Sequence, residues 1–302
     1  MGSAADMAES ESRQMKKILY MPLTATPLNN SKTYKEILPQ NAELARYIRC
    51  FWGSESPYLY QEDGDGTDKS VVIPDTCVDI IYEIDYTANI ISGGFCGIND
   101  TVFISRSDAV RGHIISTFAI RFYAWGAYPF SEDSLKGTIN GFCEVPSRFR
   151  WLDRMLRQQL FERRTLAERV NAAEELFLQR LSRVRQNNVV NNAVRQMILQ
   201  RGSLSAAELA KECFISGRQM ERLFHEYIGI TPKKLCNLVR YQFLWNDIFR
   251  NAEFDVLDAV CRYKYVDQSH LMREFKRYHG MDIQTAKGYA YNVGNIQYIS
   301  GK

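Results

Sequence analysis

The chain contains one short stretch twice. Residues 220–229 read MERLFHEYIG and residues 271–280 read LMREFKRYHG, at an offset of 51 residues. Aligned without gaps, the two copies share an arginine, a phenylalanine, a tyrosine and a final glycine. In each copy two apolar residues lie four positions apart, so they share one helix face. The final glycine suits the positive φ just past a helix end. The repeat therefore predicts two similar helices, each burying one face and ending at glycine.

A second, shorter helix is predicted before each copy. Ser205 and Glu208 form a capping-box pattern, and Ser216 with Gln219 forms another only a few residues later. A short helix, a tight turn and a second helix make a helix-turn-helix unit. The second copy repeats this order, with predicted N-caps at Asp255 and Asp267.

One helix is predicted between the two units. Thr231 suits an N-cap, Pro232 suits the first helical position, and the apolar residues that follow keep helical spacing to about Arg250. A helix of this length spans roughly 30 Å. Neighbouring major-groove segments on one face of B-DNA are about 34 Å apart. This linker helix therefore suits two helices that enter successive grooves.

Residues 189–290 resemble the DNA-binding domain of the AraC/XylS transcription regulators. The resemblance is specific in ISGRQMERLFHEYIGITPKKL (215–235) and good in VDQSHLMREFKRYHG (266–280). The sequence departs from the family pattern at Lys264, where the family has glycine, and at Ile283, where it has proline. We therefore expect the first unit to supply most of the base specificity and the second mainly to contact the DNA backbone.

The resemblance implies which residues contact DNA. Arginine can bridge the edge of guanine and glutamine the edge of adenine, whereas lysines suit phosphates. The alternative for any one arginine is a salt bridge inside the domain, and this alternative is strongest for the two repeated arginines, Arg222 and Arg273. The predicted base-facing residues are Arg218, Gln219, Glu221, Arg222, Gln268, Ser269, His270, Met272 and Arg273, and the predicted phosphate contacts are Lys233, Lys234, Lys276 and Arg277.

Charge divides the 302-residue chain unevenly. Residues 1–147 carry a net charge of −7, whereas residues 186–290 carry +4. This asymmetry favours contact between nucleic acid and the back half, although a charge of +4 also fits an ordinary solvated surface. We expect a disordered leader at 1–17, a β-rich sensor or dimerisation domain at 18–185, a double helix-turn-helix domain at 186–290 and a flexible tail at 291–302.

The front half reads as short strands separated by glycine- and aspartate-rich turns, which is typical of a small barrel or sandwich. The predicted strands are 46–52, 71–74, 77–84, 89–92, 101–104 and 113–122. This stretch is similar to the cupin-like sensor halves of some AraC-type regulators, best at IPDTCVDIIYEI (73–84) and FAIRFYAWGAYPF (118–130). The expected fold class is α+β: a cupin-like barrel or sandwich with a helical hairpin, then an all-α domain.

The front half can either hold a small-molecule effector or be filled by its own side chains and serve dimerisation. A few polar anchors among aromatic side chains are typical of a ligand pocket. The candidate pocket residues are Trp52, Asp79, Tyr82, Arg106, Arg121 and Tyr123. A sensor that binds a metabolite and touches DNA only weakly remains an alternative.

No catalytic set is visible. Metal-dependent cupins need clustered histidines, but His113 alone lies in the β region. The reactive Pro-Cys-His-Arg string of the methyl-accepting repair proteins is absent, because Cys143 sits in Phe-Cys-Glu-Val. We predict no enzyme, no metal and no cofactor; an unrecognised site in the β region is the alternative.

Residues 147–185 read as two helices with apolar stripes. Thr165 and Glu168 form a capping box at the start of the second. The stripes either cover the β structure or form a homodimer interface. The seven cysteines lack Cys-x-x-Cys spacing, which favours reduced thiols in a cytoplasmic protein. No signal peptide and no apolar run of membrane-spanning length is visible, so we expect no membrane partner.

Overall fold

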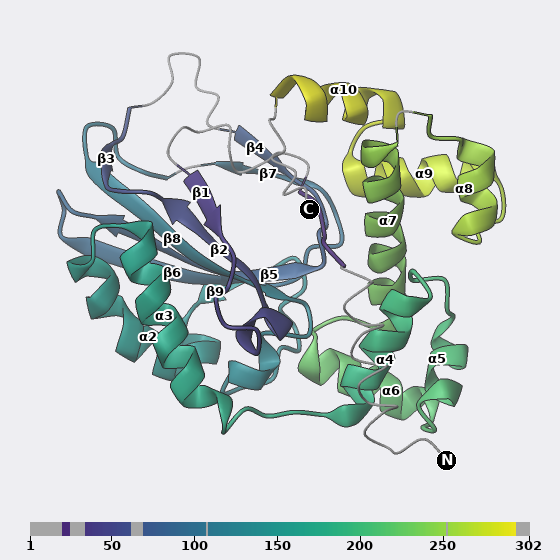
Figure 1. Cartoon of the computed structure of the whole chain (residues 1–302), viewed down its shortest axis with the longest axis horizontal. Helices are drawn as coiled ribbons and strands as arrows, with labels where there is room; N and C mark the ends of the chain where they lie inside the picture. Colours follow the sequence, from purple (N-terminus) through teal and green to yellow (C-terminus); the bar gives the residue numbers. More distant parts are fainter. Residues whose placement is uncertain (1–19, 25–33, 62–68, 107, 252, 294–302) are drawn as a thin grey trace.

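The computed structural model describes residues 20–24, 34–61, 69–106, 108–251 and 253–293. A β domain precedes a helical domain, and the two lie side by side (Figure 1). The predicted leader lies outside the described residues, as does most of the predicted tail. The last helix, α10 (Ile283–Val293), runs three residues past the predicted domain end.

One antiparallel sheet forms the centre of the β domain. Its strand order is β1-β2-β8-β5-β6-β9, and β3 also pairs with β8. The strands are β1 (Tyr34–Ile37), β2 (Ile48–Ser54), β3 (Tyr58–Leu59), β5 (Cys77–Asp85), β6 (Ile90–Cys96), β8 (Ile114–Tyr123) and β9 (Phe142–Glu144). The long pair β5 and β8 places Asp79 directly opposite Arg121.

The sheet is open, so of the two expected architectures, barrel or sandwich, the closed barrel is wrong. Strands β1 and β9 form its two edges, and a separate two-stranded ribbon joins β4 (Lys69–Val72) to β7 (Phe103–Arg106). Closure is not needed to bury the apolar face, because helices cover it. The α+β class and the β-rich front half are confirmed.

Two antiparallel helices cover that face of the sheet. They are α2 (Pro146–Glu162) and α3 (Leu166–Leu181), and the predicted capping box of Thr165 and Glu168 opens α3. Their apolar stripes are buried, with Leu156 and Phe177 both 0% exposed. The stripes therefore cover the sheet, the first of the two alternatives drawn from the sequence.

The helical domain, which we call the reading domain, contains both predicted helix-turn-helix units. After α4 (Asn188–Leu199), the first unit is α5 (Ala206–Glu212) with α6 (Gly217–Tyr227). The linker helix α7 (Pro232–Arg250) leads to the second unit, α8 (Val256–Arg262) with α9 (Gln268–His279). Figure 1 shows α7 running between the two units. The N-caps predicted at Ser205, Ser216, Thr231, Asp255 and Asp267 are all observed.

The two turns share one backbone feature and differ in length. Phe214 in the first turn has φ 54°, and Lys264 in the second has φ 53°. Both are in the left-handed region that glycine occupies without cost. Lysine therefore does not set the second turn apart, because the first turn carries a bulkier residue in the same conformation. The difference is length: the second turn holds one extra residue, Val266, before its N-cap.

Candidate nucleic-acid interface

The first reading helix, α6, presents polar side chains from its first turns. Arg218 and Gln219 are exposed, whereas Met220 and Phe224 are 0% exposed and hold the opposite face in the core. Ser216 accepts a hydrogen bond from the backbone N–H of Gln219 at 3.2 Å, which fixes the start of the helix. The capped and packed start of α6 therefore holds the backbone of these two exposed residues in place.

Glu221 and Arg222 are the other predicted base-facing residues of this helix. The Arg222 guanidinium lies 4.0 Å from the Glu226 carboxylate, and the His225 ring lies 3.9 Å from the Glu221 carboxylate. The Arg222 side chain is 68% exposed. Exposed pairs at such distances stabilise a helix by only about 0.3–0.5 kcal/mol, so these contacts would yield to a DNA base or phosphate.

The second reading helix, α9, repeats this arrangement in part. Gln268, Ser269 and Arg273 are exposed near its start. Met272 is half-buried and packs against the core. His270 is also half-buried, with its ring 5.3 Å from that of Tyr265. Three of the five predicted residues are therefore freely presented, and two face partly inward.

A buried ion pair ties α9 to the linker helix. Arg240 of α7 donates to both carboxylate oxygens of Glu274, at 2.8 and 3.0 Å. The Tyr265 hydroxyl donates to the same carboxylate at 2.8 Å. The orientation of the second reader is thus fixed by charge-assisted hydrogen bonds rather than by apolar packing alone.

The predicted phosphate contacts divide into two classes. Lys233 and Lys276 are exposed. Lys234 instead pairs with the Asp100 carboxylate of the β domain at 2.6 Å. Arg277 donates to the Tyr278 hydroxyl, and its guanidinium lies over that ring. Two of the four predicted phosphate contacts, Lys234 and Arg277, are therefore bonded to other side chains of the protein.

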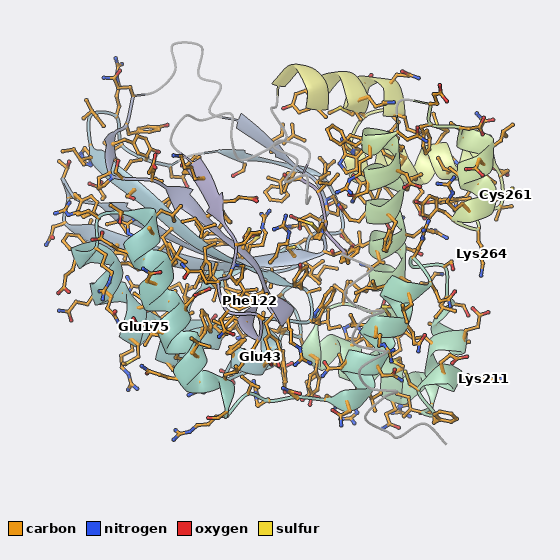
Figure 2. The ribbon with its side chains drawn as sticks, in the orientation of Figure 1. Glu43, Phe122, Glu175, Lys211, Cys261 and Lys264 are labelled. Atoms are coloured by element: carbon orange, nitrogen blue, oxygen red, sulfur yellow. The ribbon has the colours of Figure 1, made fainter. Side chains whose placement is uncertain are left out.

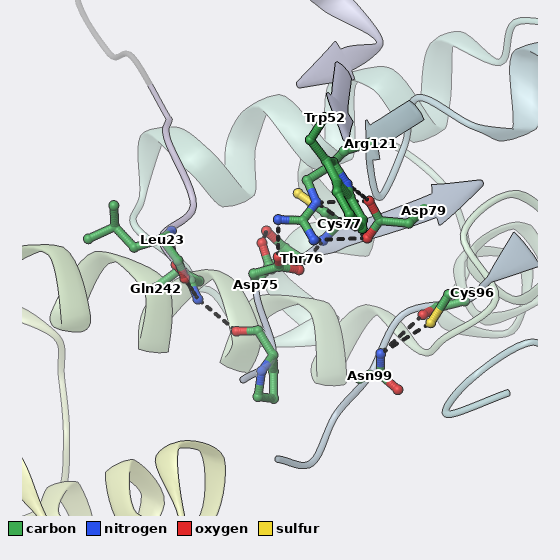
Figure 3. A network of polar contacts seen from close by, with 12 residues as sticks. Leu23, Trp52, Asp75, Thr76, Cys77, Asp79, Cys96, Asn99, Arg121 and Gln242 are labelled. Atoms are coloured by element: carbon green, nitrogen blue, oxygen red, sulfur yellow. Dashed lines mark hydrogen bonds and ion pairs between the residues drawn. The ribbon is translucent and has the colours of Figure 1, made fainter. Parts of the chain in front are cut away.

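The predicted ligand pocket is a closed polar network rather than a set of free anchors. Arg121 bonds both oxygens of Asp79 at 2.9 and 3.0 Å and lies 3.2 Å from Asp75. The Trp52 indole N–H donates to Asp79 at 3.0 Å. We call Asp75, Asp79 and Arg121 the ion network (Figure 3).

The remaining pocket candidates do not join this network. Tyr82 lies on the opposite face of β5, where burial raises the pKa of its hydroxyl and Asp153 adds to the rise. Tyr123 stacks on Trp125, with ring centroids 4.9 Å apart. Arg106 belongs to β7, but its side chain lies outside the described residues. The six candidates therefore do not line one site.

Contacts between the two domains are the feature that the sequence did not reveal. The backbone N–H of Leu135 donates to the Glu226 carbonyl at 2.9 Å, and the rings of Tyr128 and Tyr227 lie 4.0 Å apart. Gln242 of α7, 0% exposed, bonds segments of the β domain. The one available signal was a glutamine within the apolar stripe of the linker helix.

Within the described residues no group of three or more histidine, cysteine, aspartate or glutamate side chains could hold a metal ion. A search of the described helices finds none that is long and apolar enough to cross a membrane.

In comparisons with known proteins, the two halves of the chain match two different families. Residues 209–287 match a family described as helix-turn-helix domain, of the AraC type, and residues 35–141 match a domain of unknown function (DUF6597). No curated protein matches the chain.

The solved structures that are similar to this chain include three from two bacteria. An AraC-type transcriptional regulator from Chromobacterium violaceum is 16% identical, covers 36% of this chain and all of its own, with a TM-score of 0.31. Fatty-acid-bound ToxT from Vibrio cholerae is 11% identical over 78% of this chain and 94% of its own, with a TM-score of 0.37. Another ToxT structure is 12% identical over 85% and 98%, with a TM-score of 0.36.

Proposed function

We propose that this chain, whose C-terminal helices form an AraC-type helix-turn-helix domain, binds specific double-stranded DNA sequences and regulates transcription. The observation that carries the proposal is the pair of reading helices, α6 and α9, at the two ends of one 19-residue linker helix. Each begins with exposed polar side chains, as a helix that enters the major groove does.

The test is selection of random duplexes by the full-length protein, followed by binding measurements at several salt concentrations. We expect a bipartite site and an affinity that falls steeply with salt, because lysine–phosphate contacts release counterions. Uniform weak binding to every duplex would instead favour the metabolite sensor with only weak DNA contact.

Control by a small molecule in the β domain is the second part of the proposal. The ion network supports this proposal in one respect. Its charged side chains are buried beside the reading domain, and an effector could form new ion pairs with them. Such an effector must replace existing hydrogen bonds, so it needs its own charged or strongly polar group. Native mass spectrometry of the purified chain tests this proposal, and we expect a bound small molecule. A chain that carries no small molecule, and whose melting temperature does not change with a panel of charged metabolites, contradicts it.

A further inference from the structure

Gln242 is a buried polar side chain halfway along the linker helix, and all of its polar contacts cross to the β domain. Its side-chain oxygen accepts from the backbone N–H of Leu23 at 2.8 Å. Its side-chain nitrogen donates to the carbonyls of Pro74 at 2.6 Å and Leu23 at 3.2 Å. A buried amide with satisfied hydrogen bonds resists displacement, because any shift leaves these groups unpaired. The linker helix is therefore held at its centre by two β-domain segments.

Pro74 begins a turn whose next residue belongs to the ion network. The Asp75 carboxylate lies 3.2 Å from Arg121 and accepts from the backbone N–H of Cys77 at 3.0 Å. Figure 3 shows Gln242, Asp75 and Arg121 within one network of polar contacts, and Pro74, whose carbonyl bonds Gln242, directly precedes Asp75. Adjacent residues of one turn thus bond the linker helix and the centre of the sheet.

The third residue of the turn is in an unfavourable conformation. Thr76 has φ 58°, a region that a β-branched residue rarely occupies. Its hydroxyl lies 2.8 Å from that of Tyr20, whose ring packs against Phe243 of α7 at 5.3 Å. Such strain persists only where the surrounding contacts impose it, and it occurs often at ligand clamps and switch regions.

The ion network holds two carboxylates against one guanidinium. Burial raises the pKa of Asp75, and the charge of Arg121 opposes that rise. Any group that pairs with Arg121 or Asp75 would compete with the contact that holds the Asp75 side chain, and the Pro74 carbonyl that bonds Gln242 belongs to the residue before it.

We infer that the Pro74–Thr76 turn is a joint through which the ion network positions the linker helix, with Gln242 as its positioning residue, and so sets where both reading helices lie relative to the sheet. The inference rests on the proposed DNA-binding function for its consequence, but the joint itself is a property of the protein alone.

The first experiment needs no DNA. Hydrogen exchange of the full-length chain is compared for wild type and Asp75→Asn, which changes the charge of the ion network but none of the groups that bond Gln242. We expect faster exchange at the Leu23 amide, which donates to Gln242, and along the centre of α7. Asp153→Asn is the matched control, because it alters the Asp153–Arg157 pair on the far face of the sheet. Unchanged exchange at Leu23 in Asp75→Asn overturns the joint.

The second experiment measures coupling. Gln242→Leu and Asp75→Asn do not share a contact, so independent effects on unfolding free energy would add. We expect the double variant to fall short of the sum, because either change releases the same turn. If Asp75→Asn does not fold, Thr76→Gly replaces it, since that change removes the left-handed strain of the turn and its contact with Tyr20 without disturbing buried charge. Additive effects overturn the inference.

The third experiment measures binding of the full-length chain to a selected duplex. Gln242→Leu should change the affinity for that duplex while retaining the base preference of wild type, because both reading helices move together on the linker helix. Gln200→Leu, the same change at an exposed position of the reading domain, should leave the affinity unchanged. Failure of wild type to bind any duplex would refute the proposed function, whereas an unchanged affinity in Gln242→Leu would refute the joint.

Discussion

The carboxylate of Asp100 in the β domain lies 2.6 Å from the ammonium of Lys234 at the start of the linker helix. Asn140 holds the same carboxylate by a hydrogen bond of 2.6 Å. Burial raises the pKa of Asp100, but the bonds from Lys234 and Asn140 outweigh it and lower the pKa overall. The pair is therefore present at neutral pH and is lost as pH falls through the lowered pKa.

Asp100→Asn should free Lys234 for a DNA phosphate. We expect higher affinity for all sequences alike and a salt dependence steeper by about one counterion. Binding isotherms across a salt series measure both quantities. Asp133→Asn, which breaks an exposed pair with Arg150 inside the β domain, is the matched control. An unchanged salt slope in Asp100→Asn would mean that Lys234 does not reach DNA.

Arg218→Ala should relax sequence preference at one base pair and cost about 1–3 kcal/mol of specific binding. Lys276→Ala should instead weaken binding to every sequence, because a phosphate contact carries no sequence information. Parallel selections with the two variants separate these outcomes. Equal losses on specific and random duplexes for Arg218→Ala would remove it from the base-contacting set.

Phe214→Gly and Lys264→Gly should each stabilise the chain, by up to about 1 kcal/mol, because glycine relieves the left-handed strain. Both side chains are exposed, Phe214 at 95%, so little packing is lost. Figure 2 places Lys264 on the side of the reading domain that faces away from the sheet. Thermal melts test the pair, and a lower melting temperature in either variant would show that its turn side chain stabilises the fold.

His279 should make the reading domain sensitive to acid. Burial lowers the pKa of this side chain from 6.5 to about 4. The unfolded chain therefore binds a proton that the folded chain rejects, so stability is full above pH 6.5 and is lost as pH falls toward 4. The loss amounts to about 3 kcal/mol at most. His279→Gln keeps a partner for the Tyr241 hydroxyl, 2.9 Å away, and should flatten urea-unfolding stability between these pH values.

We propose that the chain forms a homodimer through the outer face of α2 and α3. Leu156 and Leu176 are buried against the sheet, so charges placed there would unfold the domain. Met155 and Leu178 are the large apolar residues that these helices expose, at 45% and 38%. Sedimentation of the Met155→Glu, Leu178→Glu double variant should show a monomer where wild type is dimeric. A monomeric wild type at tens of micromolar, as a rough scale, contradicts the proposal.

Local patterns were sufficient to predict the reading domain. Each N-cap and each glycine stop acts over a few residues, so Ser205, Asp267 and Gly280 could be identified without knowing the rest of the fold. The long strands β5 and β8 were likewise evident from β-branched and aromatic runs. The edge strands β1 and β9 were missed because each is short and carries charged residues, which mark an edge only once its neighbour is known.

The candidate ligand pocket was harder to predict because it depends on cross-strand register. Asp79 and Arg121 are far apart in sequence and become partners only when β5 pairs with β8. Alternation along β5 separates Tyr82 from Asp79, but the sequence does not say which face the helices cover. The same holds for Gln242, because a polar residue in an apolar stripe does not indicate which residues it will bond.

The bonds from Leu23 and Met21 to α7 bear on how this chain can be cut into pieces. A fragment that starts at residue 186 would leave the Gln242 amide without its protein partners and would bare Phe243 and Tyr227, which face the β domain in the intact chain. Such a fragment would tend to self-associate through this apolar surface, which becomes exposed to solvent when the β domain is removed. Replacing Phe243 and Tyr227 by hydrophilic side chains is therefore a design requirement for expressing the reading domain by itself.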